Sequence, residues 1–228
     1  MNRPRLVVFD MAGTTVDDRG AVNRCFRDAL AAVGLVADPS AVDAVMGLPK
    51  PEAIAILIRD HGRTADLGPK IGAVHDDFVA RMIGHYEGDP SVGEVPGIAG
   101  LFERLAGVGV LVALDTGFGR AIVDVILRRL GWSSPAGPVA SSVASDEVPR
   151  GRPHPDMIRH LMGRLGVPDP AAVAKVGDAP ADLLEGTNAG CGWVVGVTWG
   201  THSRDGLAAY PHTALVDLVA ELAPALGL

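Results

Sequence analysis

Asp10 is the first residue whose type and position could do chemistry. It follows the apolar run Leu6 to Phe9 and precedes Gly13, which permits an unusual backbone turn, and the Thr14 hydroxyl. Such a loop can present backbone amides to an anion while the carboxylate attacks phosphorus to form an aspartyl-phosphate. Taken alone, an Asp after a strand is more often a turn or cap residue. The hypothesis of a nucleophile therefore depends on what accompanies Asp10.

Asp178 and Asp182 form a second group of carboxylates. They lie four residues apart across a loop that leads into a predicted helix. Carboxylate oxygens suit Mg²⁺, which usually binds through one or two carboxylates together with phosphate and water. The alternative is that both side chains cap the helix and complement its dipole, and for Asp182 the two interpretations stay open. We expect Mg²⁺ as the cofactor.

Three further residues could hold the oxygens of a phosphoryl group. Thr116 and Gly117 follow a predicted strand and offer a hydroxyl and a backbone amide. Arg152 lies just before a proline-started helix and is a cation of the kind that pairs with phosphate. A solvated surface arginine is the simpler interpretation of Arg152. Each signal is weak alone, and their combination indicates phosphoryl transfer.

The elements that must position these residues alternate between strands and helices. Apolar strands are predicted at 6–9, 108–114, 173–176 and 193–197, with helices at about 98–106, 120–130 and 181–189, and a final amphipathic segment at 212–226. This alternation predicts an α/β fold with a doubly wound parallel sheet in three layers. Because ligands bind beyond the carboxyl ends of parallel strands, Asp10, Thr116 and Asp178 should converge on one crevice.

The segment between the first strand and the rest has a different pattern. From about residue 23 to 82 apolar residues recur mostly every three or four positions, which predicts helices only, and a polar linker rich in turn residues follows at 87–93. We therefore predict a core formed by residues 1–18 and 94–228, interrupted by a helical cap domain at 19–93.

Composition narrows the class of partner and the compartment. A net charge of -7 and a pI near 5.4 argue against nucleic-acid binding and favour small molecules as partners. Cys25 and Cys191 are sparse, which fits free thiols in a reducing compartment, and no apolar stretch approaches a signal peptide or a membrane span. We expect a cytoplasmic protein without membrane contact.

These segments, in this order, resemble the signature motifs of the haloacid dehalogenase superfamily, and the helical segment resembles its cap domain. The resemblance implies Asp10 as nucleophile, Thr116, Gly117 and Arg152 as phosphate ligands, and Asp178 with Asp182 around Mg²⁺. It also implies that Gly13, Thr14 and Met46 contact substrate or phosphate, that Ala12 contributes to the metal site, and that a homodimer is possible.

Ala12 departs from the pattern of the superfamily's phosphatases, which resemble this chain but carry a second Asp there as general acid and base. Loss of such a group typically costs ~10²- to 10⁴-fold in rate. The segment 10–17 instead resembles phosphonoacetaldehyde hydrolase (phosphonatase), which has Ala at this place and cleaves a carbon–phosphorus bond through a lysine Schiff base. The matching residue is Lys50. Its place near a predicted helix N-terminus favours the neutral amine, although a solvated side chain is the simpler interpretation.

Other positions differ from that branch of the superfamily. Phosphonatases usually have a cap cysteine, a His and a Tyr where this chain has Gly20, Ala53 and Phe118.

Three hypotheses about function follow, in order of preference. The first is a hydrolase of phosphonoacetaldehyde or a related carbonyl phosphonate. The second is a phosphatase of a small phosphoester, similar to phosphoglycolate phosphatase. The third is a non-catalytic phospholigand-binding protein.

Overall fold

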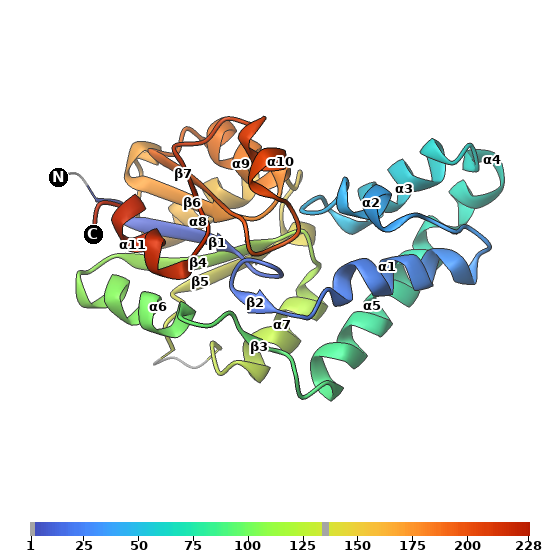
Figure 1. Cartoon of the computed structure of the whole chain (residues 1–228), viewed down its shortest axis with the longest axis horizontal. Helices are drawn as coiled ribbons and strands as arrows, with labels where there is room; N and C mark the ends of the chain where they lie inside the picture. Colours follow the sequence, from blue (N-terminus) through green and yellow to red (C-terminus); the bar gives the residue numbers. More distant parts are fainter. Residues whose placement is uncertain (1–2, 134–136) are drawn as a thin grey trace.

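The computed structural model describes residues 3–133 and 137–228 and is built around a parallel sheet (Figure 1). Its six strands lie in the spatial order β5 (Ser141–Ala144), β4 (Leu111–Thr116), β1 (Leu6–Asp10), β6 (Val173–Gly177), β7 (Trp193–Val197) and β8 (Ala214–Val216). β1 is central and every one of its residues is buried, as a continuous apolar run predicts for a strand covered on both faces. The α/β prediction is confirmed.

Alternation along β1 divides the core into two layers. Val7 and Phe9 face one cluster of apolar side chains and Leu6 and Val8 face another. Helices α6 (Ile98–Gly107), α7 (Arg120–Arg129) and α11 (Leu222–Ala225) supply the first cluster, whereas α8 (Asp156–Leu165) and α9 (Pro180–Ala189) supply the second. Short elements complete the chain at α10 (Arg204–Ala208), η2 (Ser145–Glu147), η3 (Pro170–Ala172) and η4 (Val219–Glu221). The sheet therefore has helices on both sides, in three layers.

Between β1 and α6 the chain makes a helical insertion, which we define as residues 21–88. It consists of α1 (Ala21–Ala32), α2 (Pro39–Asp43), α3 (Lys50–Asp60), α4 (Thr64–Leu67), η1 (Gly68–Lys70) and α5 (Ile71–Gly88). Phe26 of α1 packs on Phe78 of α5 with ring centroids 5.1 Å apart. Figure 1 shows the insertion to the right of the sheet, and a short antiparallel ribbon of β2 (Val16–Asp17) and β3 (Gly93–Glu94) joins its two ends.

The structure departs from the predicted elements at three places. β4 begins at Leu111 instead of 108, because Val108 caps α6 and Gly109 follows in the left-handed conformation at φ 75°. The predicted amphipathic segment at 212–226 is wrong as a single element, since its first part pairs with β7 as the edge strand β8. β5 was not predicted, because a four-residue strand with two serines lacks an apolar signature.

No helix in the described ranges combines the length and the apolar character that crossing a membrane would require.

Candidate active site

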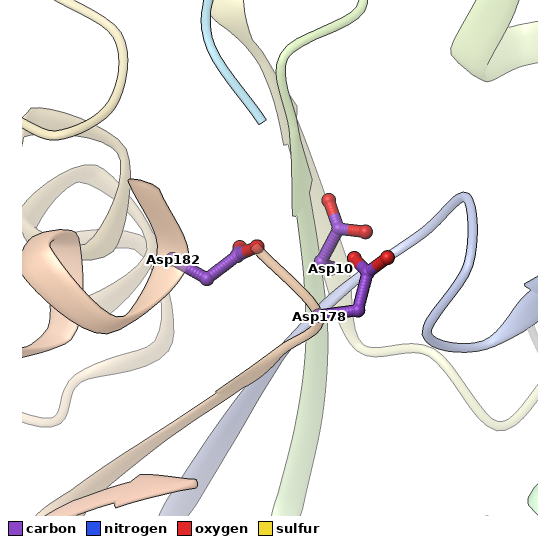
Figure 2. Close-up of side chains that lie close together, drawn as sticks. All are labelled: Asp10, Asp178 and Asp182. Atoms are coloured by element: carbon purple, nitrogen blue, oxygen red, sulfur yellow. The ribbon is translucent and has the colours of Figure 1, made fainter. Parts of the chain in front are cut away.

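The carboxyl ends of β1, β4 and β6 meet at one cavity of about 380 Å³. Asp10 ends β1, Thr116 ends β4 and Asp178 follows β6, and all three line this cavity. Figure 2 shows the carboxylates of Asp10 and Asp178 side by side, with Asp182 approaching from the first turn of α9. As predicted, these three strand ends meet at one cavity.

The loop after β1 is folded tightly against Asp178. Gly13 has φ 87°, and a Cβ there would lie 2.5 Å from Asp178 Oδ2, so a side chain would be excluded. Thr14 is fully buried, and its hydroxyl donates to Asp178 Oδ1 at 3.3 Å. The Thr201 amide donates to Asp178 Oδ2 at 2.6 Å. These contacts fix the carboxylate of Asp178 before any ligand arrives.

The donor set at this cavity fits a hard divalent cation. Single oxygens of Asp10, Asp178 and Asp182 all lie within 4.8 Å of one another and all three residues are buried. Burial raises the pKa of Asp10 to about 7, with Arg152 opposing the rise and Asp182 adding to it. Burial, followed by the charge of Asp182, also raises the pKa of Asp178. The site therefore has a surplus of negative charge that Mg²⁺ would neutralise.

Both carboxylate oxygens of Asp182 already have partners within the protein. Its Oδ1 forms ion pairs of 3.0 Å with Arg152 Nη1 and with Lys175 Nζ, and its Oδ2 accepts from the Ala179 amide at 3.2 Å. Unlike Asp10 and Asp178, it does not line the cavity. This arrangement suits a residue that orients its neighbours better than one that contacts the cation directly.

Arg152 lies behind Asp10. It is fully buried, and Nη1 donates to Asp10 Oδ1 at 2.7 Å while the guanidinium also pairs with Asp115. Arg152 is not among the residues that line the cavity, so the contact shown is with the carboxylate of Asp10. A direct contact between Arg152 and phosphate stays a prediction.

A network of buried charges extends beneath the cavity. Arg152 and Lys175 are surrounded by Asp115, Asp182 and Glu185, and all five side chains are fully buried. The pKa of Glu185 lies well above its ordinary value, because burial and the charge of Asp115 both disfavour a second carboxylate. Two cations would face two anions in this network if Glu185 held a proton, and their charges would then balance.

Lys50 reaches the cavity from the helical insertion. It is only 4% exposed, it lines the cavity together with Asp10, and its Nζ lies 5.8 Å from the ring centroid of Phe26 and 5.3 Å from that of Phe118. Burial lowers its pKa to about 8, although the charges of Asp10 and Asp178 oppose the shift. The simpler interpretation of Lys50, a solvated side chain, is wrong because the structure encloses the amine.

Glycines allow the segment before Lys50 to approach the sheet. A Cβ on Gly117 would lie 2.5 Å from the Leu48 carbonyl oxygen, and one on Gly151 would lie 2.5 Å from Pro49 Cγ. Gly47, at φ 82°, similarly lies against Ala181 of α9. The insertion therefore rests directly on the turns that follow β4 and β5.

The structure brings together most of the residues predicted from the sequence. Of the residues predicted from the sequence, those that line the cavity are Asp10, Ala12, Gly13, Met46, Lys50, Thr116, Gly117 and Asp178. Thr14, Arg152 and Asp182 are buried and hold those residues from behind.

Sequence reasoning missed Lys175, Asp115 and Asp18. A lysine within the apolar strand β6 is itself a signal, because a buried lysine needs a carboxylate partner. No pattern in the sequence marks Asp17 or Asp18, both of which line the cavity.

The fold and the site together define a class of hydrolases. Its features here are a parallel sheet whose central strand ends in a buried Asp, further carboxylates at the end of the next strand, and a helical insertion. The family model for haloacid dehalogenase-like hydrolases matches residues 4–190, and the chain belongs to that family. The recognition of this superfamily from the sequence is confirmed.

Similar proteins include two kinds of hydrolase. A phosphonoacetaldehyde hydrolase of Bacteroides fragilis is 30% identical over 97% of this chain and 88% of its own length. A probable phosphatase, IndB, of Dickeya dadantii is 32% identical over 95% of this chain and 91% of its own length. Among solved structures, a phosphonoacetaldehyde hydrolase-like protein of Oleispira antarctica has a TM-score of 0.85 at 22% identity, covering 99% of this chain and 92% of that one.

Proposed function

We propose that this protein is an Mg²⁺-dependent hydrolase that cleaves the carbon–phosphorus bond of phosphonoacetaldehyde or a related carbonyl phosphonate. The observation that carries the proposal is Lys50, a buried lysine with a pKa lowered to about 8 that lines the same cavity as Asp10. Relatives named phosphonoacetaldehyde hydrolase support it.

Ala12 and Lys50 together explain why the bond would be carbon–phosphorus. With Ala12 in place of a carboxylate, the loop after Asp10 has no acid to protonate a departing alkoxide. A carbon leaving group needs somewhere to place its electron pair, and an iminium at Lys50 provides it. A neutral amine is required to form that iminium, and burial of Lys50 favours the neutral form.

The reaction begins when the Lys50 amine condenses with the aldehyde and releases water. An oxygen of Asp10 then attacks phosphorus, the bond from phosphorus to carbon breaks, and its electron pair forms the carbon–carbon double bond of an enamine on Lys50. Water hydrolyses the aspartyl-phosphate to phosphate and restores Asp10. Hydrolysis of the protonated enamine releases acetaldehyde and restores the amine.

The remaining residues of the cavity bind and orient the phosphonate. Thr116 and Gly117 lie at the end of β4 beside Asp10, where a hydroxyl and an amide can donate to its oxygens. Asp10, the Ala12 carbonyl and Asp178 would hold Mg²⁺, with Asp182 fixing their surroundings. When bound, the cation would neutralise charge on the phosphoryl oxygens. Arg152 keeps the carboxylate of Asp10 in place.

A phosphatase of a small phosphoester is the second candidate. It is favoured by the probable phosphatase among the relatives and by Gly20, Ala53 and Phe118, none of which has a side chain that could transfer protons during imine chemistry. A putative phosphoglycolate phosphatase of Lactobacillus delbrueckii has a TM-score of 0.81 at 22% identity over 98% of both chains, which supports the fold alone.

The test is incubation of the protein with Mg²⁺ and phosphonoacetaldehyde, with and without borohydride. We expect phosphate and acetaldehyde, and a reduced adduct on Lys50 located by peptide mass spectrometry. Asp10→Asn should abolish phosphate release and leave the adduct. Lys50→Met should abolish both, whereas Lys70→Met, at an exposed lysine of the same insertion, should change neither.

Absence of an adduct on Lys50 and of phosphate from this substrate would overturn the proposal. Hydrolysis of phosphoglycolate or another phosphoester that survives in Lys50→Met would establish the phosphatase instead.

A further inference from the structure

A buried carboxyl group lies at the cavity without an ion-pair partner. Asp18 is 6% exposed, it lines the cavity together with Lys50 and Asp10, and no ion pair of 4.0 Å or less involves it in the described part of the chain. Its Oδ1 accepts from the Gly20 amide at 3.0 Å. The ring of His85 contacts the backbone carbonyl of Asp18 at 3.1 Å and forms no hydrogen bond with its carboxyl group. A buried, unpaired carboxyl group at a reaction cavity calls for a function.

Tyr86 of α5 connects Asp18 to the surroundings of Lys50. Its hydroxyl lies 3.4 Å from Asp18 Oδ2, and Tyr86 itself is fully buried. The Tyr86 ring meets the Phe118 ring edge-on at 6.3 Å, and Phe118 is one of the two rings beside the Lys50 amine. When ionised, Asp18 is also among the groups that raise the pKa of Lys50. Asp18 and Lys50 therefore line the same cavity and lie close enough to interact electrostatically.

We propose that Asp18, held by Tyr86, is the catalytic proton donor to the carbon that leaves phosphorus. This inference rests on the proposed function, because it requires an enamine on Lys50. The enamine carbon must gain a proton before acetaldehyde can be released, and positions 20, 53 and 118 offer no group that could supply it.

The proton balance closes over two steps. The carboxylic acid of Asp18 gives its proton to the enamine carbon, the electron pair of the carbon–carbon double bond forms the new C–H bond, and the nitrogen becomes an iminium. Water then attacks the iminium carbon and passes a proton to the Asp18 carboxylate, which restores the acid. Burial raises the pKa of Asp18, which is the direction that a proton donor needs.

The test separates cleavage of the carbon–phosphorus bond from release of the carbon product. Asp18→Asn keeps the size of the side chain and an oxygen that can accept from the Gly20 amide. A single turnover followed by phosphorus NMR should show the bond cleaved at nearly the wild-type rate. Steady-state turnover should fall by ~10²-fold or more, and the protein should accumulate covalently modified at Lys50.

Tyr86→Phe removes only the hydroxyl group and should give a smaller loss of steady-state turnover, again with the first turnover preserved. Asp60→Asn makes the same change of charge on the exposed surface of the insertion and should match the wild type.

Steady-state turnover of Asp18→Asn within about threefold of the wild type would overturn the inference, as would loss of the first turnover together with the later ones. If Asp18→Asn does not fold, unaltered turnover in Tyr86→Phe would overturn it. Failure of the proposed function would be distinguishable, because the wild type itself would then form no adduct on Lys50.

Discussion

The amine of Lys50 lies where a positive charge is penalised. It is almost fully buried, so the pKa falls to about 8 although Asp10 and Asp178 favour the charged form. A free lysine has a pKa near ~10.4. At neutral pH a usable fraction of Lys50 is therefore uncharged.

This shift predicts the pH dependence of imine formation. The neutral amine attacks the aldehyde, so the rate should be low where Lys50 is protonated, rise through pH values near the pKa of about 8, and level off above it. The measurement is the rate of adduct formation on Lys50 with cyanoborohydride in Asp10→Asn, which cannot cleave the bond. Because the charge of Asp10 raises the pKa of Lys50, the midpoint in this variant should lie at or below about 8. A midpoint near the ordinary lysine value would contradict the prediction.

The protonation of Glu185 decides the net charge of the buried network. Because burial and the charge of Asp115 raise the pKa of Glu185 well above its ordinary value, we expect a neutral carboxyl group there, and Glu185→Gln should change the free energy of unfolding by less than about 1 kcal/mol. Asp115→Asn removes an anion from beside Arg152 and Lys175 and should lower that free energy by about 3–5 kcal/mol. Urea unfolding of both variants is the measurement, and equal losses would show that Glu185 is charged.

At the scale of elements, the candidate catalytic residues lie at the carboxyl ends of β1, β4 and β6, and this placement could be predicted. Each follows an apolar run, and the carboxyl ends of parallel strands share one edge, so Asp10, Thr116 and Asp178 were expected together. The partners of Arg152 could not be predicted. They come from β1, β4 and α9, and nothing local in the sequence indicates which carboxylates a buried guanidinium meets.

The loop after β7 is a further element that fixes the site. The Trp199 indole donates to the Thr14 carbonyl at 3.2 Å, and a Cβ on Gly200 would lie 2.2 Å from Asp178 Oδ2. Gly200→Ala should therefore displace Asp178 and weaken Mg²⁺ binding by ~10- to 100-fold. Gly206→Ala, where the nearest atom lies 3.6 Å away, is the matched control. Calorimetric titration with Mg²⁺ measures the affinity, and identical affinities in the two variants would argue against this role.

At the scale of the whole molecule, the site exists only where the insertion touches the sheet. Gly151 allows Pro49, the neighbour of Lys50, to pack against the turn after β5, and a Cβ on Gly151 would lie 2.5 Å from Pro49 Cγ. Gly151→Ala should move Lys50 away and slow adduct formation by ~10- to 100-fold, because small displacements of a reacting group are costly. Gly163→Ala on α8, where a Cβ meets open space, should react as the wild type does. Equal rates of adduct formation would contradict the prediction.

The antiparallel ribbon of β2 and β3 bears on how such a protein could evolve. Val16 pairs with Glu94 and Asp17 with Gly93, so the chain leaves and re-enters the core at a single narrow neck. β1 and β4 are already adjacent below that neck, and the sheet is complete without the helices above it. A different helical segment spliced between residues 17 and 93 would leave Asp10 intact while exchanging Lys50 and Phe26, one of the two rings beside its amine. On the proposed function, the core would supply the attack on phosphorus, and the exchangeable part would supply the amine on which cleavage of a carbon–phosphorus bond depends.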